Sequence, residues 1–550
     1  MGLLPSIVFC TCAVVGLFLY SAALGFLYEH SEVKQLTTAQ YSMAVLYGVI
    51  FVAWFGCEAG FGVARMQPRY DAVAEDEQDL VTPELKEGEK SPAPTLHSDA
   101  KLFIFKASHL PILRLCAEFV GIMGFIYLCD RTTLVAKGPK YVNHYAFWAV
   151  NAAILLLAAF TLRGGEGTPA VDGHVKPLQR DQTEEWKGWM QIMFVLYHYF
   201  AEAPIYNAIR MYIAAYVWMT GFGNFSYYYI KKDFTAVRFT QMMWRLNFFV
   251  VFVCLTMNNE YMLYYICPMH TFFTWGVFIP LFMFKEYNDS FTVLFVKILC
   301  TAGVAVLLYD VPGVFGTVMA PFRALLDFHD PLHPENSPTH EWFFRSGLDH
   351  LVWVFGMFCA FSFPWLDSKL EQIESLPSGK ANFATLTILG VATLLGLWWY
   401  YSYFSLSKRE YNKVHPYTSF APIFLYLVFR NLTEALRKRH LHLFAWCGKI
   451  TLETYILQFH VWMKTTGING SPKFLMVWFP GMYWTNFVVV SAVYIFLSFR
   501  VFHITAALRD WVIPKEGGAA LGYRALTLAA GTAVTYGAGY VLSQSAASPQ

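Results

Sequence analysis

Apolar blocks of about 20 residues recur along this 550-residue chain, and each is long enough to cross the roughly 30 Å hydrocarbon core of a bilayer. One such block is compatible with a signal sequence or a buried core helix, but a long series of them is not. Backbone polar groups inside a bilayer must be paired within the protein, which favours helices for spans of this length. The sequence therefore predicts an all-α, polytopic membrane protein with about 13–15 transmembrane helices.

Two polar stretches interrupt the apolar pattern and divide the chain. Residues 1–65 hold the first two predicted transmembrane helices, and residues 66–107 are polar and acidic, which predicts a disordered cytosolic linker. Residues 108–545 form the main multi-spanning region. Within it, residues 313–347 hold several prolines and histidines and predict an ordered surface or re-entrant loop.

Composition excludes several classes of function. Hydrophobic residues make up 56% of the chain and charged residues 14%, well below the roughly 25% of soluble domains. The net charge of +2 gives no basic field that would bind nucleic acid. The ten cysteines lie mostly within apolar blocks and form no CxxC pair, which is typical of buried hydrophobic side chains.

The lysines and arginines of short loops predict the orientation of the spans. Lys231 and Lys232 end one block, residues 437–439 crowd a second loop, and Arg500 and Arg509 crowd a third. Counting spans places all three loops on one face, which we assign to the cytosol. The 313–347 loop then faces the lumen, and the basic loop at 405–415 is an exception because it falls on the lumenal side as well.

Polar residues inside apolar blocks are candidates for function because they are costly in hydrocarbon. Lys187 and His198 are eleven residues apart, which places them on one helix face with a rise of about 16 Å between them. Lys187 would lie at the cytosolic mouth and His198 well inside the membrane. Histidine is the usual acid or base near neutral pH, although a histidine that merely joins two helices remains an alternative. Asn207 and Arg210 follow across a break at Pro204.

A second cluster follows the glycines of residues 220–223, which favour close helix packing or a broken helix. Arg238 and Arg245 are seven residues apart and therefore share a helix face in an otherwise apolar segment. Together with Lys231 and Lys232 they suit a polyanionic ligand such as coenzyme A, whose phosphates bind Arg and Lys donors. For the two lysines an ordinary positive-inside belt is the favoured alternative.

A third cluster lies at the predicted lumenal side. Arg345 and Asp349 are spaced as ion-pair partners on a helix, with Glu341 and His350 beside them.

In a later apolar segment, Lys449, Glu453 and His460 are offset by four and seven residues and share a face. Such a stripe favours either a proton path or a link between two helices. The histidines of the 313–350 region match no metal-ligand spacing, so we expect no metal.

Several of these segments resemble a known family. The stretches DQTEEWKGWMQ, YNAIR, YVWMTGFGNFSYYY, MMWRLNF, NNEYMLYYICPMHT, HEWFFRSGLD and GKITLETYILQFH are similar to the acyltransferase domain of fungal capsule acetylation proteins and animal sialic-acid O-acetyltransferases. The likeness is greatest to plant reduced wall acetylation proteins and covers about residues 100–545.

A more distant resemblance is to the bacterial acyltransferase-3 superfamily, and it implies an acyltransferase-3-like core. That family's first core helix has a basic residue, ten residues and an essential histidine, which Lys187 and His198 match here. Residues 220–222 resemble its small-residue turn, Arg238 and Arg245 its arginine-bearing helix, and residues 448–460 its last motif.

The resemblance implies a Golgi-type membrane O-acetyltransferase that uses cytosolic acetyl-CoA to acetylate cell-wall polysaccharides in the lumen. It implies that His198 is a base or transient acetyl carrier and that Asn207 and Arg210 orient the thioester. Lys187, Arg238 and Arg245 would hold coenzyme A. The remaining predicted residues form the acceptor side or a proton path: Glu341, Arg345, Asp349, His350, Glu453 and His460.

The chain departs from the fungal and animal relatives because no stretch of it offers their soluble SGNH-type esterase-like domain. The plant relatives lack this domain too, which implies separate lumenal SGNH-type acetyltransferases as partners. Two other functions remain open: a transporter that moves acetyl-CoA or an acetyl donor across the membrane, and a non-catalytic scaffold. The sequence does not specify the polysaccharide.

Overall fold

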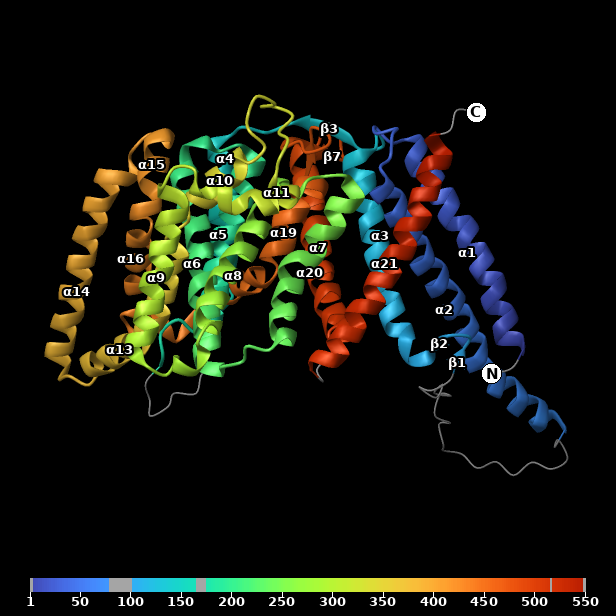
Figure 1. The fold of residues 1–550 in the computed structure, drawn as a ribbon, viewed down its shortest axis with the longest axis horizontal. Coiled ribbons are helices and arrows are strands. Elements are labelled where there is room, and N and C mark those ends of the chain that lie inside the picture. Colours follow the sequence, from blue (N-terminus) through green and yellow to red (C-terminus); the bar gives the residue numbers. More distant parts are fainter. Residues whose placement is uncertain (1–2, 79–100, 165–174, 515–516, 548–550) are drawn as a thin grey trace. The chain divides into compact units, whose positions relative to one another are not determined.

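The fold is described from a computed structural model that describes residues 3–78, 101–164, 175–514 and 517–547. Chain contacts divide these residues into two units, the first built from residues 1–136, 255–258 and 500–550 and the second from residues 137–254 and 259–499. Both are helical (Figure 1), which confirms the predicted fold class. Each unit is described separately.

The first unit is a set of long helices. In it α2 packs against α1, α3 and α21. α2 continues to Gln78, past residue 65 where the linker was predicted to begin, and the middle of that linker, residues 79–100, lies outside the described residues. The elements of this unit are α1 (Leu3–Glu29), α2 (Thr38–Gln78), β1 (Lys101–Leu102), β2 (Phe105–Lys106), η1 (Ala107–His109), α3 (Leu110–Arg131) and α21 (Gly518–Ala547).

The second unit holds every predicted site residue. Its helices are α4 (His144–Ala159), α5 (Arg180–Phe200), α6 (Tyr206–Lys231), α7 (Ala236–Met257), α8 (Ile266–Phe282), α9 (Phe291–Asp310), α10 (Val314–Met319), α11 (Arg323–Leu326), α12 (His340–Gly347), α13 (Val352–Glu374), α14 (Ser378–Trp399), α15 (Lys408–Thr418), α16 (Phe420–Asn431), α17 (Glu434–Arg437), α18 (His442–Lys449), α19 (Thr451–Leu457) and α20 (Tyr483–Val512), the last continuing into the first unit. Short 3₁₀ segments are η2 (Ala203–Ile205), η3 (Tyr261–Tyr264), η4 (Lys285–Tyr287) and η5 (Ala320–Phe322), and π-helical segments are η6 (Tyr400–Phe404) and η7 (Gln458–Trp462).

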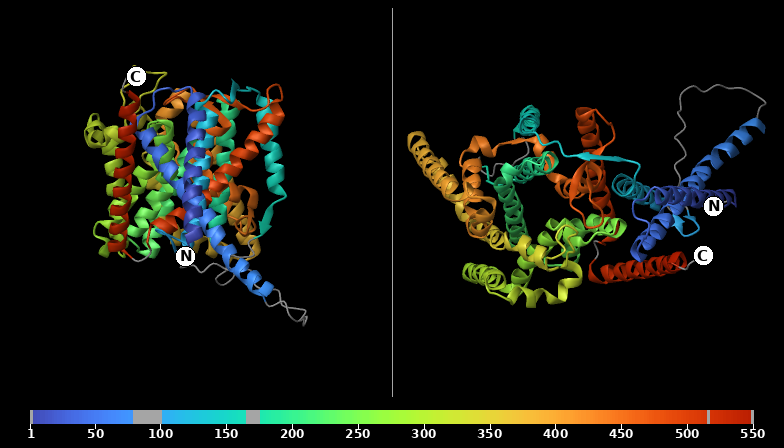
Figure 2. Two further views of the ribbon diagram at one scale, coloured as in Figure 1. Left: turned by 90° about the vertical axis from the view of Figure 1, so that its right-hand side faces the viewer. Right: turned by 90° about the horizontal axis from the view of Figure 1, so that it is seen from above.

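Two small sheets cap the second unit at opposite ends. At one end β4 (Leu162–Gly164) pairs with β5 (Arg439–Leu441). At the other end β3 (Ala136–Pro139), β7 (Pro472–Val477) and β6 (Met463–Thr465) form a three-stranded sheet in that order. The right-hand view of Figure 2 shows the end with the three-stranded sheet from above, with many of the helices seen nearly end-on.

We call the first of these ends the basic end, because it carries Lys231, Lys232 and the stretch 437–439. The other is the loop end, which carries α10, α11 and the start of α15 (Figure 1). The predicted lumenal loop at 313–347 is ordered as short helices there, and the basic segment at 405–415 lies at the same end, as the span count required.

Nine helices within the described residues are long and apolar enough to cross a bilayer, and four shorter apolar helices accompany them. α5 and α6 belong to neither group because their sequences are less apolar, and α5 carries several charged residues. In α5, 12 of 21 residues are buried, whereas α14 buries only Ala392 and Trp399. A helix enclosed by other helices can carry polar residues that a lipid-facing helix cannot.

Glycines set the close crossings around α5 and α6. Gly188 of α5 faces Gly448 of α18, and Gly221 of α6 faces Gly356 of α13. A Cβ atom at any of these four positions would collide with the backbone of the facing helix. The predicted close packing at residues 220–223 is therefore confirmed for Gly221, and α6 is not broken there.

Candidate active site

His198 occupies the last turn of α5, close to the loop end rather than in the middle of the helix. Its Nδ1 lies 3.1 Å from Oε1 of Gln458, the first residue of the π-helical segment η7. The amide of Gln458 donates through Nε2 to the Tyr455 carbonyl at 3.0 Å. A carbonyl can only accept, so the amide nitrogen must face Tyr455 and its oxygen must face His198.

This contact selects one form of the His198 ring. Because Gln458 presents an acceptor, Nδ1 of His198 must carry a proton and donate it. In a neutral imidazole the other nitrogen, Nε2, then holds the lone pair. Within the described residues Nε2 has no hydrogen-bond partner, and the side chain is not fully buried. The ring is thus arranged to act as a base or nucleophile through Nε2.

Aromatic and cationic groups surround His198. The Phe194 ring lies 4.5 Å away, centroid to centroid, and Phe194 also meets Tyr455. Lys140, in the loop before α4, donates from Nζ to the His198 carbonyl at 2.7 Å. This carbonyl is in the last turn of α5, where a cation offsets the negative end of the helix dipole. Arg345 is near enough for its charge to act on His198.

Arg345 does not pair with Asp349, so the ion pair predicted from their spacing is wrong. Nε of Arg345 bonds instead to Oε2 of Glu341, one turn earlier in α12, at 3.0 Å. The guanidinium also lies 4.6 Å from the Tyr265 ring centroid. α12 ends at Gly347, so Asp349 lies beyond the helix and the four-residue spacing no longer places it beside Arg345.

Asp349 joins three elements in a fully buried polar cluster. Its Oδ2 accepts from Arg210 of α6 at 2.8 Å, and its Oδ1 lies 3.4 Å from Nε2 of His415 in α15. Exposed fractions are 2% for Arg210 and zero for the other two. Tyr411 contacts Nδ1 of His415 at 3.1 Å. Arg210 therefore pairs with Asp349 through NH2, while its buried Nε and NH1 have no hydrogen-bond partner in the described part of the chain. Its predicted role at a thioester oxyanion stays a prediction.

Asn207 is also committed elsewhere. Its Nδ2 donates to the carbonyls of Phe404 and Leu406, at 2.8 and 2.9 Å. These two carbonyls belong to the end of η6 and the turn that follows it. Asn207 therefore anchors this turn to the start of α6. Its predicted catalytic role stays a prediction.

The residues predicted to hold coenzyme A have different environments. Lys187 pairs with Glu184 at 2.7 Å in the same helix, and Lys232 pairs with Asp289 at 2.5 Å. Arg238 stacks over the Tyr227 ring at 4.1 Å, and its buried Nε has no hydrogen-bond partner in the described part of the chain. Of the predicted phosphate ligands, Arg238 is the one whose guanidinium is left with an unused donor.

Arg245 and Glu453 form a two-bond ion pair between α7 and α19. NH1 bonds to Oε1, and NH2 bonds to Oε2 at 3.0 Å, while Glu453 is fully buried. His460 instead contacts the Tyr264 hydroxyl through Nε2 at 2.5 Å. Glu453 and His460 therefore bond to different elements, and His460 lies within the π-helical turn of η7, where the helical register changes.

His350 is buried beside the Asp349 cluster but bonds to other groups. Its Nδ1 contacts the Gly347 carbonyl at 2.5 Å, its Nε2 lies 3.8 Å from Asp310, and its ring stacks on Tyr309. No group of three His, Cys, Asp or Glu residues that could hold a metal ion occurs among the described residues.

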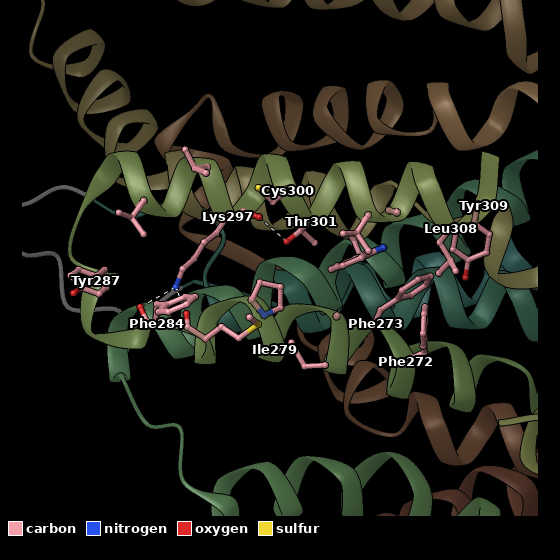
Figure 3. Close-up of a pocket in the computed structure, with 18 of the residues that line it drawn as sticks. Phe272, Phe273, Ile279, Phe284, Tyr287, Lys297, Cys300, Thr301, Leu308 and Tyr309 are labelled. Carbon is pink, nitrogen blue, oxygen red and sulfur yellow. Dashed lines mark hydrogen bonds between the residues drawn. The ribbon is translucent and has the colours of Figure 1, made fainter. Parts of the chain in front are cut away.

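A groove of about 870 Å³ between α8 and α9 reaches Tyr309, the residue on which His350 stacks (Figure 3). Its walls are mostly apolar, with Tyr309 toward one end and Lys297 toward the other. Lys297 donates to the Met283 and Phe284 carbonyls and to Asn288, and so caps the end of α8. None of the predicted site residues lines this groove, and it is not the candidate active site.

Sequence reasoning missed three residues that hold the site together. Gln458 fixes the His198 tautomer, Lys140 bonds to the carbonyl of the same residue, and His415 completes the Asp349 cluster. Gln458 was recognisable as a polar residue in an apolar segment, two positions before His460. Lys140 and His415 carry no such signal because each lies in a polar stretch of the sequence.

Comparisons with known proteins place the chain in a family. It is 31% identical over 415 residues to the N-acetylneuraminate (7)9-O-acetyltransferase of Danio rerio, an alignment that covers 72% of this chain and 50% of the relative. The chain therefore spans about half the length of this curated relative. No solved structure matches the chain. Residues 30–522, most of the chain, match the 10 TM Acyl Transferase domain found in Cas1p, and the chain belongs to this acyltransferase family.

Proposed function

We propose that this protein is a membrane O-acetyltransferase that takes acetyl groups from acetyl-CoA and delivers them to saccharide hydroxyls. Family membership supports acyl transfer, and the Danio rerio relative is named as an O-acetyltransferase. The observation that carries the proposal is the environment of His198, where Gln458 fixes one tautomer and Nε2 is left available.

Two reaction routes use this nitrogen, and each accounts for every atom and proton. As a base, Nε2 takes the proton of the acceptor hydroxyl while its oxygen attacks the thioester, and the proton then passes to the departing thiolate of coenzyme A. As a carrier, Nε2 attacks the thioester itself, and thiolate leaves and takes up a proton from water. The acceptor hydroxyl then displaces the imidazole from the acetyl group and gives up its proton to the hydroxide that remained from that water. Both routes give the acetyl ester and free coenzyme A.

Coenzyme A enters, in this proposal, from the basic end. The loops of Lys231, Lys232 and residues 437–439 make that end the cytosolic one by the positive-inside rule. Arg238 stacks on Tyr227 and forms no ion pair within the described residues, which leaves the charge of its guanidinium for a phosphate group. Arg245 and Lys187 already have carboxylate partners: the pair of Arg245 joins α7 to α19, and the pair of Lys187 lies within α5.

The acceptor is proposed to meet the acetyl group at the loop end, where α5 ends beside Arg345 and Glu341. The likeness to plant wall acetylation proteins supports a cell-wall polysaccharide acceptor, a Golgi location, and separate lumenal SGNH-type acetyltransferases as partners. The name of the Danio rerio relative specifies a sialic acid. A saccharide hydroxyl is common to both.

The test is acetyl transfer from labelled acetyl-CoA to oligosaccharides by purified protein in nanodiscs. His198→Gln keeps a polar side chain of similar length but removes the basic nitrogen, and we expect transfer to fall about 100-fold or more. His333→Gln is the matched control, since His333 is a loop histidine with 61% of its side chain exposed. It should leave transfer unchanged.

Retained binding of acetyl-CoA and an unchanged unfolding temperature would show that His198→Gln acts on the chemistry. If the folded variant transferred acetyl at the rate of the unsubstituted protein, the proposed role of His198 would be wrong. If no acetyl transfer occurred with any saccharide but coenzyme A crossed a sealed membrane, the protein would be a transporter instead.

A further inference from the structure

Three lysines gather at the loop end, beside the end of α5. Lys137 lies in β3, Lys140 directly follows that strand, and Lys473 lies in the neighbouring strand β7. Lys137 and Lys473 are exposed, and Lys140 is half-buried. Lys140 bonds to the carbonyl of His198, so this lysine cluster directly contacts the helix turn that carries the proposed base.

The positive charge of the lysine cluster is not neutralised by the described part of the chain. Burial and the charge of Lys473 lower the pKa of Lys140 to about 8, and no carboxylate acts on it in the opposite direction. Within the described residues, neither Lys137 nor Lys473 has a carboxylate in ion-pair contact. Like charges held together are unfavourable unless an anion binds to them.

The usual reason for lysines in a membrane protein does not explain this cluster. Loop lysines and arginines accumulate on the cytosolic face, which corresponds here to the basic end. Lys137 and Lys473 instead lie on strands of the sheet at the loop end, where β3 and β7 are seen in Figure 1, and Lys140 directly follows β3. If the basic end faces the cytosol, as proposed, the positive-inside rule does not account for these lysines, and they need another role.

Aromatic rings border the lysine cluster. Tyr141 follows Lys140 and packs on Tyr483, with ring centroids 4.2 Å apart, and Trp484 lies 6.3 Å from Tyr141. Tyr141 and Trp484 are 37% and 51% exposed. Lys137 lies 5.2 Å from the Phe474 ring. Rigid amphipathic rings supply contact area for a polar ligand at little cost in conformational entropy.

We propose that Lys137, Lys140 and Lys473 form the acceptor site and bind a saccharide that carries a carboxylate. The inference rests on the proposed function, and it adds the charge class of the acceptor and the place where it docks. The lysines bind the carboxylate, and Tyr141 with Trp484 contacts the sugar rings. A hydroxyl near the carboxylate is then brought to the end of α5, where His198 lies.

The test is binding of an oligogalacturonate and of a neutral oligosaccharide of equal length to the full chain in nanodiscs of zwitterionic lipid. The unsubstituted protein should bind the acidic oligosaccharide more tightly, and added salt should weaken that binding. Lys473→Gln should weaken it roughly tenfold, since a hydrogen bond to a charged group is lost. Lys473→Arg should largely restore it.

Lys413→Gln is the matched control, an exposed lysine of α15 at the same end. It should not change binding. Equal binding of the acidic and neutral oligosaccharides, or Lys473→Gln binding the acidic one within about twofold of the unsubstituted protein, would overturn the inference. A Lys473 effect seen solely with anionic phospholipid in the nanodisc would overturn it too, and assign the cluster to a lipid headgroup.

Binding and transfer are measured separately, so the two proposals can fail independently. Acidic binding that depends on Lys473 without any acetyl transfer would support the anion site and contradict the proposed function. Acetyl transfer to the neutral oligosaccharide at an equal rate, with no effect of Lys473→Gln, would support the proposed function and contradict the anion site.

Discussion

Replacing Asp349 by Asn should destabilise this protein far more than the same change at a surface carboxylate. Asp349 is fully buried and accepts from Arg210 at 2.8 Å and from His415 at 3.4 Å. The asparagine is nearly the same size but carries no charge. The Arg210 guanidinium is 2% exposed, and its Nε and NH1 already lack partners among the described residues. It would then be a buried cation without its counter-ion.

The expected cost follows from this burial. Removing one partner of a buried ion pair typically costs about 3–5 kcal/mol of unfolding free energy, mostly because the other charge stays buried and unpaired. Replacing both residues, in the double variant Arg210→Met with Asp349→Leu, removes both charges. It leaves His415 without its contact to Asp349, which should cost about 1–3 kcal/mol of unfolding free energy. The double variant should therefore be more stable than the Asp349→Asn variant.

The assay is unfolding in mixed micelles of rising denaturing-detergent content, followed by tryptophan fluorescence. The control is Asp289→Asn in the exposed Lys232–Asp289 pair, whose side chains are 59% and 76% exposed. That change should cost less than about 1 kcal/mol. Equal effects of Asp349→Asn and Asp289→Asn, or a double variant as unstable as the sum of its two single changes, would refute the reasoning.

Three further predictions concern packing, titration and pairing. Gly221→Ala should lower the unfolding temperature and Gly223→Ala should not, because an added Cβ would collide with the facing helix at the first position and meet nothing at the second; thermal unfolding of the two variants checks this, and equal shifts would contradict it. Lys140 should react with an amine-labelling reagent with a midpoint near pH 8, because its folded pKa is lowered. Since the unfolded chain then binds more protons between about pH 8 and 10.5, this group makes folding stability rise with pH over that window; labelling followed by mass spectrometry reads the midpoint, and a value near 10.5 would be the contrary result. Arg245→Gln and Glu453→Gln should each destabilise the protein, and the second change should add little to the first, because the two side chains share one ion pair; a double-variant cycle of unfolding free energies with fully additive effects would argue against the pair.

The membrane architecture could be predicted because it depends on local composition. Apolar runs of the length of a span, and the lysines and arginines of the loops between them, required no knowledge of contacts. Close packing at Gly221 could also be predicted from local sequence, because glycine in an apolar helix favours close approach of another backbone. The identity of the facing helix, α13, could not.

The partners of the polar residues could not be predicted, because helix spacing describes one helix and these contacts join several. Arg345 and Asp349 had the spacing of a pair, yet α12 ends between them. Glu453 and His460 had the spacing of one face, yet they bond to different elements, and His460 lies within a π-helical turn. His198 was identified as a candidate, but the tautomer that makes it usable depends on Gln458, 260 positions away in the chain.

The most direct measurement uses sealed proteoliposomes that contain the protein in one orientation, with the acetyl and coenzyme A parts of acetyl-CoA labelled separately. Acetyl-CoA is supplied at the basic end and an oligosaccharide acceptor is enclosed at the loop end. We predict that the acetyl label appears on the acceptor while the coenzyme A label stays outside, and that His198→Gln abolishes the acetyl signal. Coenzyme A label inside the vesicles, or acetylated acceptor formed by folded His198→Gln protein at the unsubstituted rate, would contradict this account.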